Sequence, residues 1–277
     1  MPKMYQRLVV TATSTPLLSG NAKHFARETE LLFGEEANLL EEVGRHYLVT
    51  TESYSMPGYV LKDAVRVLSR GRTASYTHRV KVITATLYEK ASFKAPDLLG
   101  RSLALNARVR CTAHAGSPEG DMSFIEGLGW IFSDQIIKRH EFLTDYVDTA
   151  LKYVGPASAY AWGGRVPPDC SALVQQALIA AGIPCPRNAG EQSKSLGIEV
   201  DMQDPDFKLK RGDFVFWTAI PGKSRHVAIM VDWDNCVHAS IAPPRHTMLQ
   251  KMQDVIAHQR EGGNGDSNVV RRFPNRP

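Results

Sequence analysis

The stretch DCSALVQQALIAAGIP, residues 169–184, decides the fold of the C-terminal half of the chain. Its apolar residues recur at the 3.6-residue spacing of a helix with one buried face: Leu173, Val174, Ala177, Leu178 and Ala181. Asp169 is a good N-cap, Gly182 is a good residue just past a helix end, and Pro184 stops the helix. The pattern predicts a helix that begins at Cys170.

Cys170 would occupy the first position of this helix, and that position favours a reactive thiol. The backbone N–H groups of a first turn have no helical partner, and the helix dipole is positive there. Both effects lower the pKa of a thiol, and a low pKa is the main determinant of cysteine reactivity. Position alone leaves a second interpretation open, in which Cys170 is a small buried residue at a helix start.

After residue 211 the apolar pattern changes from helical to strand-like. Four strands are predicted: 214–217, 226–231, 236–239 and 269–273. A tight turn at 232–235 joins two of them, so His226 at the start of one lies near His238 at the end of the next. A nucleophile, a base and a group that orients the base form a catalytic triad. Taken singly, either histidine could also be structural.

The first 140 residues contain short β segments at roughly 8–12-residue spacing, which is typical of small barrels. The pattern restarts near residue 79, after a polar linker at 69–77. A helical segment is predicted over 142–154. The expected fold is therefore multidomain, with two small all-β barrels followed by an α+β domain. The expected domains are 1–70, 77–140 and 141–277.

The composition excludes several other classes of protein. The chain has 277 residues, a net charge of +4, 43% hydrophobic residues and 22% charged residues, which are ordinary globular values. No apolar run reaches the length of about 18 residues that predicts a membrane span. The small charge excess gives little support for a nucleic-acid partner. The apolar run near the N-terminus is too short for a signal peptide, so a cytoplasmic location is expected.

The four cysteines show neither a paired spacing nor metal-ligand spacing with histidine. We therefore expect free thiols and no metal or organic cofactor.

Six short motifs occur in an order that resembles the NlpC/P60 family of cysteine peptidases: Tyr160-x-Trp-Gly-Gly164, Asp169-Cys-Ser171, Pro186-Arg-Asn188, Arg211-Gly-Asp213, His226-Val-Ala-Ile229 and His238-Ala-Ser240. The resemblance covers about residues 141–277. The preceding part is similar to paired bacterial SH3 (SH3b) domains, as found in the dipeptidyl-peptidase VI-like branch of γ-D-glutamyl-L-diamino acid endopeptidases. The resemblance to that branch implies a papain-like catalytic domain behind two SH3b barrels.

The resemblance also implies roles for individual residues. Cys170 would attack the substrate carbonyl, His226 would act as general base, and His238 would orient His226. The substrate would be a murein peptide with a free N-terminal L-Ala, cut between γ-D-Glu and the diamino acid. Four residues would bind it: Asp169, Ser171, Glu35 and Tyr54. Glu36 and Tyr59 compete with the last two, because the match there is loose.

The family usually has glycine at the position of Ala172, and a single methyl group on a helix should leave activity intact. Two other function classes remain open. One is a wall-peptide-binding module without activity, against which the intact Cys170, His226 and His238 argue. The other is a papain-like amidase or acyltransferase, against which the motif set argues.

Overall fold

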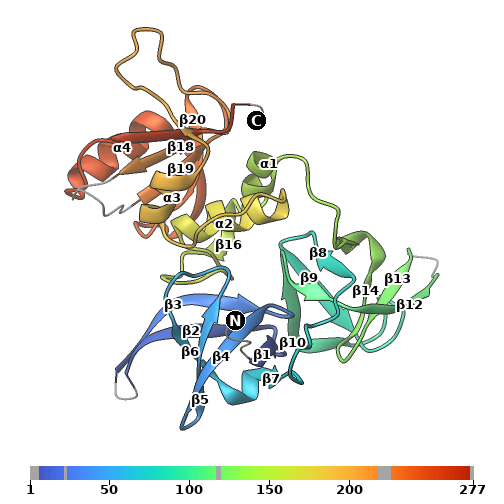
Figure 1. Ribbon diagram of the computed structural model, residues 1–277. Coiled ribbons are helices and arrows are strands. Elements are labelled where there is room, and N and C mark those ends of the chain that lie inside the picture. The colour runs from blue at the N-terminus through green and yellow to red at the C-terminus, as the bar shows by residue number, and fades with distance from the viewer. Residues whose placement is uncertain (1–5, 22–23, 117–119, 218–225, 275–277) are drawn as a thin grey trace. The chain divides into compact units, whose positions relative to one another are not determined.

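The computed structural model describes residues 6–21, 24–116, 120–217 and 226–274. The chain divides into two compact units, Met1–Phe142 and Leu143–Pro277. The first is built from strands, and the second combines strands with helices (Figure 1).

The N-terminal unit begins with seven strands and one 3-10 turn: β1 (Gln6–Val10), β2 (Ser14–Asn21), β3 (His24–Leu32), β4 (Glu36–Val43), β5 (His46–Thr51), β6 (Gly58–Leu61), η1 (Lys62–Ala64) and β7 (Val65–Val67). They form one antiparallel sheet in the order β3-β2-β6-β5-β4-β1-β7. Alternate residues of these strands point into one apolar core, which includes Leu8, Leu17, Leu31, Val49 and Val60.

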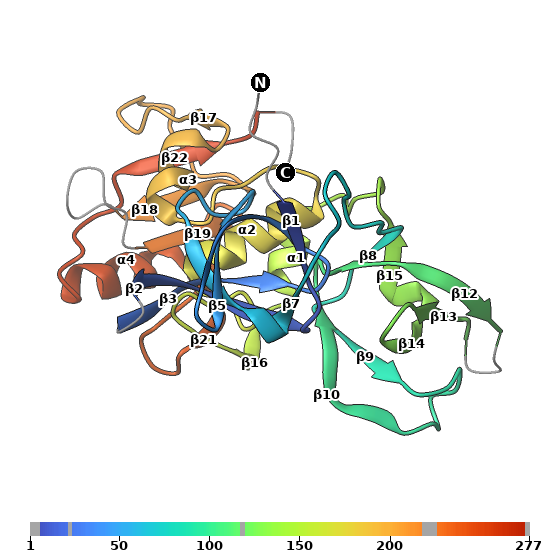
Figure 2. The same ribbon diagram turned by 60° about the horizontal axis from the view of Figure 1, so that its bottom comes forward.

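In its described residues, the second half of this unit has eight strands and one 3-10 turn: β8 (His78–Val80), β9 (Thr84–Tyr88), β10 (Asp97–Ala104), β11 (Arg108–Val109), β12 (Cys111–Ala115), β13 (Met122–Ile125), β14 (Gly129–Phe132), η2 (Ser133–Gln135) and β15 (Ile136–Lys138). The sheets are β10-β9-β14-β13-β12 and β11-β8-β15 (Figure 2). The clearest repeat is the pair β6-η1-β7 and β14-η2-β15. A glycine is the first residue of β6 and of β14, and an aspartate lies in each 3-10 turn.

The expected closed barrels are wrong, because no sheet closes on itself in the part of the chain that the structure describes. The spacing of short apolar segments along a sequence indicates roughly how many strands there are. Closure depends on whether the first strand pairs with the last, and that pairing is non-local.

The two β halves meet at Gly34. Its φ of +75° is a conformation that glycine adopts without strain, and a Cβ there would lie 2.0 Å from the carbonyl oxygen of Arg108. The Arg108 N–H donates to the Phe33 carbonyl at 2.9 Å. A glycine is therefore required at this close approach.

The described residues of the C-terminal unit form four helices and seven strands: α1 (Tyr146–Leu151), β16 (Gly155–Ala159), α2 (Cys170–Ala180), α3 (Ala189–Ser195), β17 (Ile198–Glu199), β18 (Phe214–Trp217), β19 (His226–Met230), β20 (Asn235–Ala239), β21 (His246–Lys251), α4 (Met252–Glu261) and β22 (Val269–Arg272). The strands form one antiparallel sheet, β16-β21-β20-β19-β18-β22-β17. No helix among the described residues is long and apolar enough to cross a bilayer.

Helices cover both faces of this sheet. Met252 and Val255 of α4 pack on one face, against apolar residues of β18, β19, β20 and β22. On the other face, Tyr146 of α1 stacks on Phe214 with ring centroids 5.4 Å apart. Helix α2 contacts β19 and β20. This packing brings the start of α2 to the two strands that carry the histidines.

The helix predicted over 142–154 is shorter in the structure, because Asp145 caps it. The Asp145 side chain accepts hydrogen bonds from the N–H groups of Val147 and Asp148. The helix therefore begins at Tyr146, and the apolar Phe142 is left outside it.

Candidate active site

Cys170 opens α2, as the sequence predicts. Asp169 is the N-cap, and its Oδ1 accepts the Ala172 N–H at 2.8 Å. The backbone N–H groups of Val227 and Ser171 hydrogen-bond to the thiol. Val227 directly follows His226 on β19, so the sulfur lies at the end of β19 that carries this histidine.

The environment of the thiol contradicts one expectation. Cys170 is only 8% exposed, and burial raises the pKa of its thiol to about 12, with a further upward contribution from the charge of Asp169. The Val227 N–H, the charge of Arg187 and the Ser171 N–H act in the opposite direction but do not outweigh desolvation. The expected net lowering of the Cys170 pKa is therefore wrong, and Cys170 is a neutral thiol in this structure.

Two histidines and a glutamine form a continuous chain beside the thiol. His226 Nε2 lies 2.9 Å from His238 Nδ1, with the two rings nearly perpendicular. His238 Nε2 lies 2.7 Å from Gln250 Oε1 on β21. His226 is 7% exposed and His238 is 2% exposed. The structure thus brings together the two histidines that the sequence placed at one sheet edge.

Burial keeps both imidazoles neutral. Desolvation lowers the pKa of His226 well below its ordinary value, and Coulombic interaction with His238 and His258 lowers it further. Burial also lowers the pKa of His238, which Gln250 raises in part and His258 lowers. A neutral imidazole near a neutral thiol can act as a general base that accepts the thiol proton.

Gln250 determines where the imidazole protons lie. Its Oε1 can only accept, so His238 Nε2 carries a hydrogen and His238 Nδ1 is a bare acceptor. His226 Nε2 must then donate to His238 Nδ1, which leaves His226 Nδ1 without a hydrogen. The chain of hydrogen bonds therefore selects the tautomer of His226 in which Nδ1 is the unprotonated, basic nitrogen.

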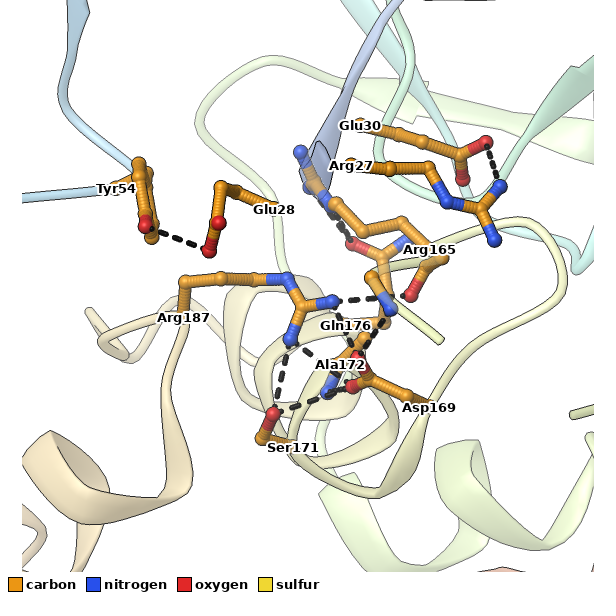
Figure 3. A network of polar contacts seen from close by, with 12 residues as sticks. Arg27, Glu28, Glu30, Tyr54, Arg165, Asp169, Ser171, Ala172, Gln176 and Arg187 are labelled. Carbon is orange, nitrogen blue, oxygen red and sulfur yellow. Dashed lines mark hydrogen bonds and ion pairs between the residues drawn. The ribbon is translucent and has the colours of Figure 1, made fainter. Parts of the chain in front are cut away.

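Arg187 holds together the loop before Cys170 (Figure 3). Its guanidinium makes a two-pronged ion pair with Asp169, at 2.9 Å and 2.7 Å, and also donates to Ser171 Oγ at 2.9 Å. It reaches the Gly164 carbonyl at 3.2 Å. The Arg187 side chain is 1% exposed and that of Asp169 is 10% exposed. This buried pair fixes the residues on both sides of the nucleophile.

Comparisons with known proteins agree with this geometry. Residues 157–259 match the NlpC/P60 family. This segment is an NlpC/P60 domain. The chain thus contains a hydrolase domain of a peptidase family, and the match includes the helix that Cys170 opens and the strands of both histidines.

The matches that extend over most of the chain have low sequence identity. Dipeptidyl-peptidase 6 of Lysinibacillus sphaericus is 23% identical over 254 residues, which are 84% of this chain and 87% of that protein. An NlpC/P60 family protein from Bacillus cereus superposes with a TM-score of 0.74 at 17% identity, over 96% of this chain and 99% of that one. An NlpC/P60 endopeptidase from Photobacterium damselae subsp. piscicida has a TM-score of 0.58 at 12% identity, over 96% of this chain and 66% of that one. These structures show the shared fold.

The side chains of Asp169 and Ser171 already make hydrogen bonds within the C-terminal unit. Asp169 Oδ1 accepts from Ala172, Ser171 and Arg187, and Oδ2 accepts from Gly163 and Arg187. Ser171 Oγ already lies between Asp169 and Arg187. Both residues thus order the helix start, and their binding of a substrate amine stays a prediction.

Glu35 and Tyr54 belong to the N-terminal unit, and both are buried. Glu35 accepts the Leu32 N–H at 2.9 Å and so closes the turn after β3. The Tyr54 hydroxyl donates to Glu28 at 3.0 Å (Figure 3). Their predicted contacts with substrate stay predictions.

The competing candidates at those two positions have partners of their own. Glu36 pairs with Arg7 at 2.9 Å and accepts the Ala74 N–H at 2.8 Å. Tyr59 packs against the ring of Phe25, with centroids 5.3 Å apart.

Sequence reasoning missed three residues of the site. Gln250 was not assigned, because the strand β21 was not predicted. Tyr160 was named only as part of a motif, with no chemical role. Desolvation, followed by the charges of Cys170 and Asp169, raises the pKa of its phenol, so the hydroxyl keeps its proton and can donate. Trp217 lies against His226 with ring centroids 5.5 Å apart and screens the imidazole from water.

No group of three His, Cys, Asp or Glu side chains suited to a metal ion occurs among the described residues.

Proposed function

We propose that this chain is a cysteine peptidase that cuts the bond between γ-D-Glu and the diamino acid of murein peptides with a free N-terminal L-Ala. The observation that carries the proposal is the continuous hydrogen-bonded chain Gln250–His238–His226 beside the thiol of Cys170. A buried neutral thiol without a base would be inert. A base that is held in one tautomer beside the thiol can remove its proton during the attack and so makes the sulfur a nucleophile.

In the first step, His226 Nδ1 takes the proton of Cys170 as the sulfur attacks the peptide carbonyl. The developing imidazolium is stabilised by its Nε2–H bond to His238, at 2.9 Å. The carbonyl oxygen becomes an oxyanion. The Cys170 N–H at the helix start and the hydroxyl of Tyr160 are the proposed donors to it.

The tetrahedral intermediate collapses when His226 returns the proton to the leaving amine of the diamino acid. The thioester on Cys170 is then hydrolysed by a water that His226 deprotonates, and the dipeptide leaves with a new carboxyl group. Each proton that enters the imidazole leaves it again, so the free enzyme is regenerated.

Three lines of argument support the substrate. The family match assigns the domain to peptidases. The relative named dipeptidyl-peptidase 6 aligns with 84% of this chain, which includes part of the N-terminal unit. The expected SH3b character of that unit, with Glu35 and Tyr54 as amine ligands, would explain a need for a free N-terminus. We propose that the activity serves the recycling of wall peptides in the cytoplasm.

The test compares L-Ala-γ-D-Glu-diaminopimelate with its N-acetyl form. Acetylation removes the ammonium and leaves its buried carboxylate partner unpaired, which costs about 3–5 kcal/mol, so kcat/KM should fall by roughly two to four powers of ten. Equal kcat/KM for both peptides would refute the requirement for a free amine. Cleavage of neither peptide would refute the proposed substrate.

A pair of variants tests the proposed amine ligand. Glu35→Gln keeps an oxygen for the Leu32 N–H but loses the charge, so KM for the free peptide should rise at least about tenfold. Glu36→Gln is the matched control and should leave KM unchanged. The reverse order would show that Glu36 is the ligand.

A further inference from the structure

A second cysteine–histidine pair lies in the N-terminal unit. Cys111 Sγ lies 3.6 Å from His114 Nε2, and His114 Nδ1 lies 3.0 Å from Ser123 Oγ. Ser123 Oγ continues to Ser133 Oγ at 2.7 Å. Ser123 is fully buried, whereas His114 is exposed. A thiol, an imidazole and two hydroxyls thus form a second hydrogen-bonded chain.

An irregularity in β12 creates this pair. In a regular strand, residues three apart point to opposite faces of the sheet. The register between β12 and β13 shifts between Cys111 and Ala113, so that Thr112 is an extra residue. A bulge of this kind re-aims the side chains that follow it. It turns His114 to the side of Cys111 and places it directly opposite Ser123.

We propose that Cys111 is a modification site that forms mixed disulfides with small disulfides, with His114 as its base and Ser123 as the group that orients His114. His114 Nε2 takes the thiol proton, and the thiolate attacks one sulfur of the disulfide. A bond forms from Cys111 Sγ to that sulfur, and the disulfide bond of the reagent breaks. The departing thiolate takes the proton from His114, so the products are a mixed disulfide and one free thiol.

The proton positions agree with this role. Ser123 can accept a hydrogen bond from His114 Nδ1–H and donate its own hydrogen to Ser133. That direction leaves His114 Nε2 bare and facing the sulfur. The Cys111 thiol also lies 3.5 Å from the Ala113 carbonyl, an acceptor that cannot carry the proton away. His114 is therefore the base within reach.

The other cysteines do not share these properties. Cys170, Cys185 and Cys236 are buried, and Cys111 is partly exposed. Burial raises the pKa of Cys236 to about 12 and raises that of Cys185 as well. His78 on β8 is a titratable neighbour of His114, and burial and His114 lower the pKa of His78. Cys111 thus combines access with a base.

The experiment uses the Cys170→Ala chain, so that the proposed catalytic thiol does not consume the reagent. The protein is treated at neutral pH with a limiting amount of bis(2-hydroxyethyl) disulfide, quenched with acid and mapped by mass spectrometry. The same chain with His114→Ala is the test variant. His140→Ala, an exposed histidine of the same unit, is the matched control.

The mixed disulfide should form first at Cys111. Its rate should fall about tenfold in His114→Ala, because the thiolate is the nucleophile and that variant lacks the base that removes the thiol proton. It should stay unchanged in His140→Ala. Added imidazole should restore part of the rate in His114→Ala, which a merely structural histidine would not allow. First reaction at Cys185 or Cys236, or an unchanged rate in His114→Ala, would overturn the proposal.

Discussion

Replacing Gln250 by methionine should slow catalysis without weakening substrate binding. Gln250 is partly exposed, and in the structure its role at the site is to accept the His238 Nε2–H at 2.7 Å. Methionine has a similar length but offers no comparable acceptor. His238 could then place its hydrogen on Nδ1 and donate to His226. In that tautomer His226 Nδ1 carries a hydrogen and cannot take the proton of Cys170.

The size of the effect follows from the burial of His238, which is 2% exposed. A buried donor without a partner costs about 1–3 kcal/mol. A cost of about 1.4 kcal/mol removes roughly nine-tenths of the competent tautomer. We therefore expect kcat to fall about tenfold, or more, while KM stays within about a factor of two.

The assay is steady-state cleavage of the free tripeptide by the wild type, Gln250→Met and Gln253→Met. Gln253 is an exposed residue of α4, so its variant controls for the substitution itself. Melting temperatures of the three proteins separate an effect on folding from one on catalysis. An unchanged kcat in Gln250→Met, with the fold intact, would refute the assignment of tautomers.

Three further predictions concern the same site. Arg187→Met leaves the buried Asp169 carboxylate without its ion pair, so urea unfolding should show a loss of about 3–5 kcal/mol, and a loss below about 1 kcal/mol would contradict the buried pair. His226→Gln should reduce kcat by about 10²–10⁴-fold, whereas His238→Asn should keep measurable activity; the reverse order would mean that the roles are exchanged. Because burial lowers the pKa of His226 and raises that of Cys170 to about 12, kcat/KM should stay flat from about pH 6.5 to 7.5 and fall at lower pH, where His226 gains a proton; above about pH 8 it should fall again, because the free amine of the substrate loses its charge, and an acid limb above pH 6.5 would contradict a buried neutral base.

Local signals in the sequence were sufficient for the helix that presents Cys170. Its cap at Asp169 and its apolar spacing depend on neighbouring residues, and the helix begins at the predicted position. The strands of His226 and His238 were also found, because a tight turn fixes their pairing. Each of these features is determined within a few residues of sequence.

Non-local features were not found in this way. The prediction of closed barrels was wrong, because closure requires pairing between strands that are distant in the sequence. The direction of the Cys170 pKa shift was predicted wrongly, because a sequence shows the helix start but not how deeply it is buried. Gln250 lies on β21, and its contact with His238 depends on the pairing of β20 with β21. The turn of His114 toward Cys111 depends on a bulge that strand periodicity does not reveal.

The most direct test of the account is acid-quenched mass spectrometry of the enzyme during cleavage of L-Ala-γ-D-Glu-diaminopimelate. The account predicts a transient adduct of one L-Ala-γ-D-Glu acyl group, mapped to Cys170, together with release of the free diamino acid. The Cys170→Ala chain should show neither the adduct nor the products. Cleavage by that variant, or an acyl group mapped to another residue, would contradict the assignment of Cys170 as the nucleophile.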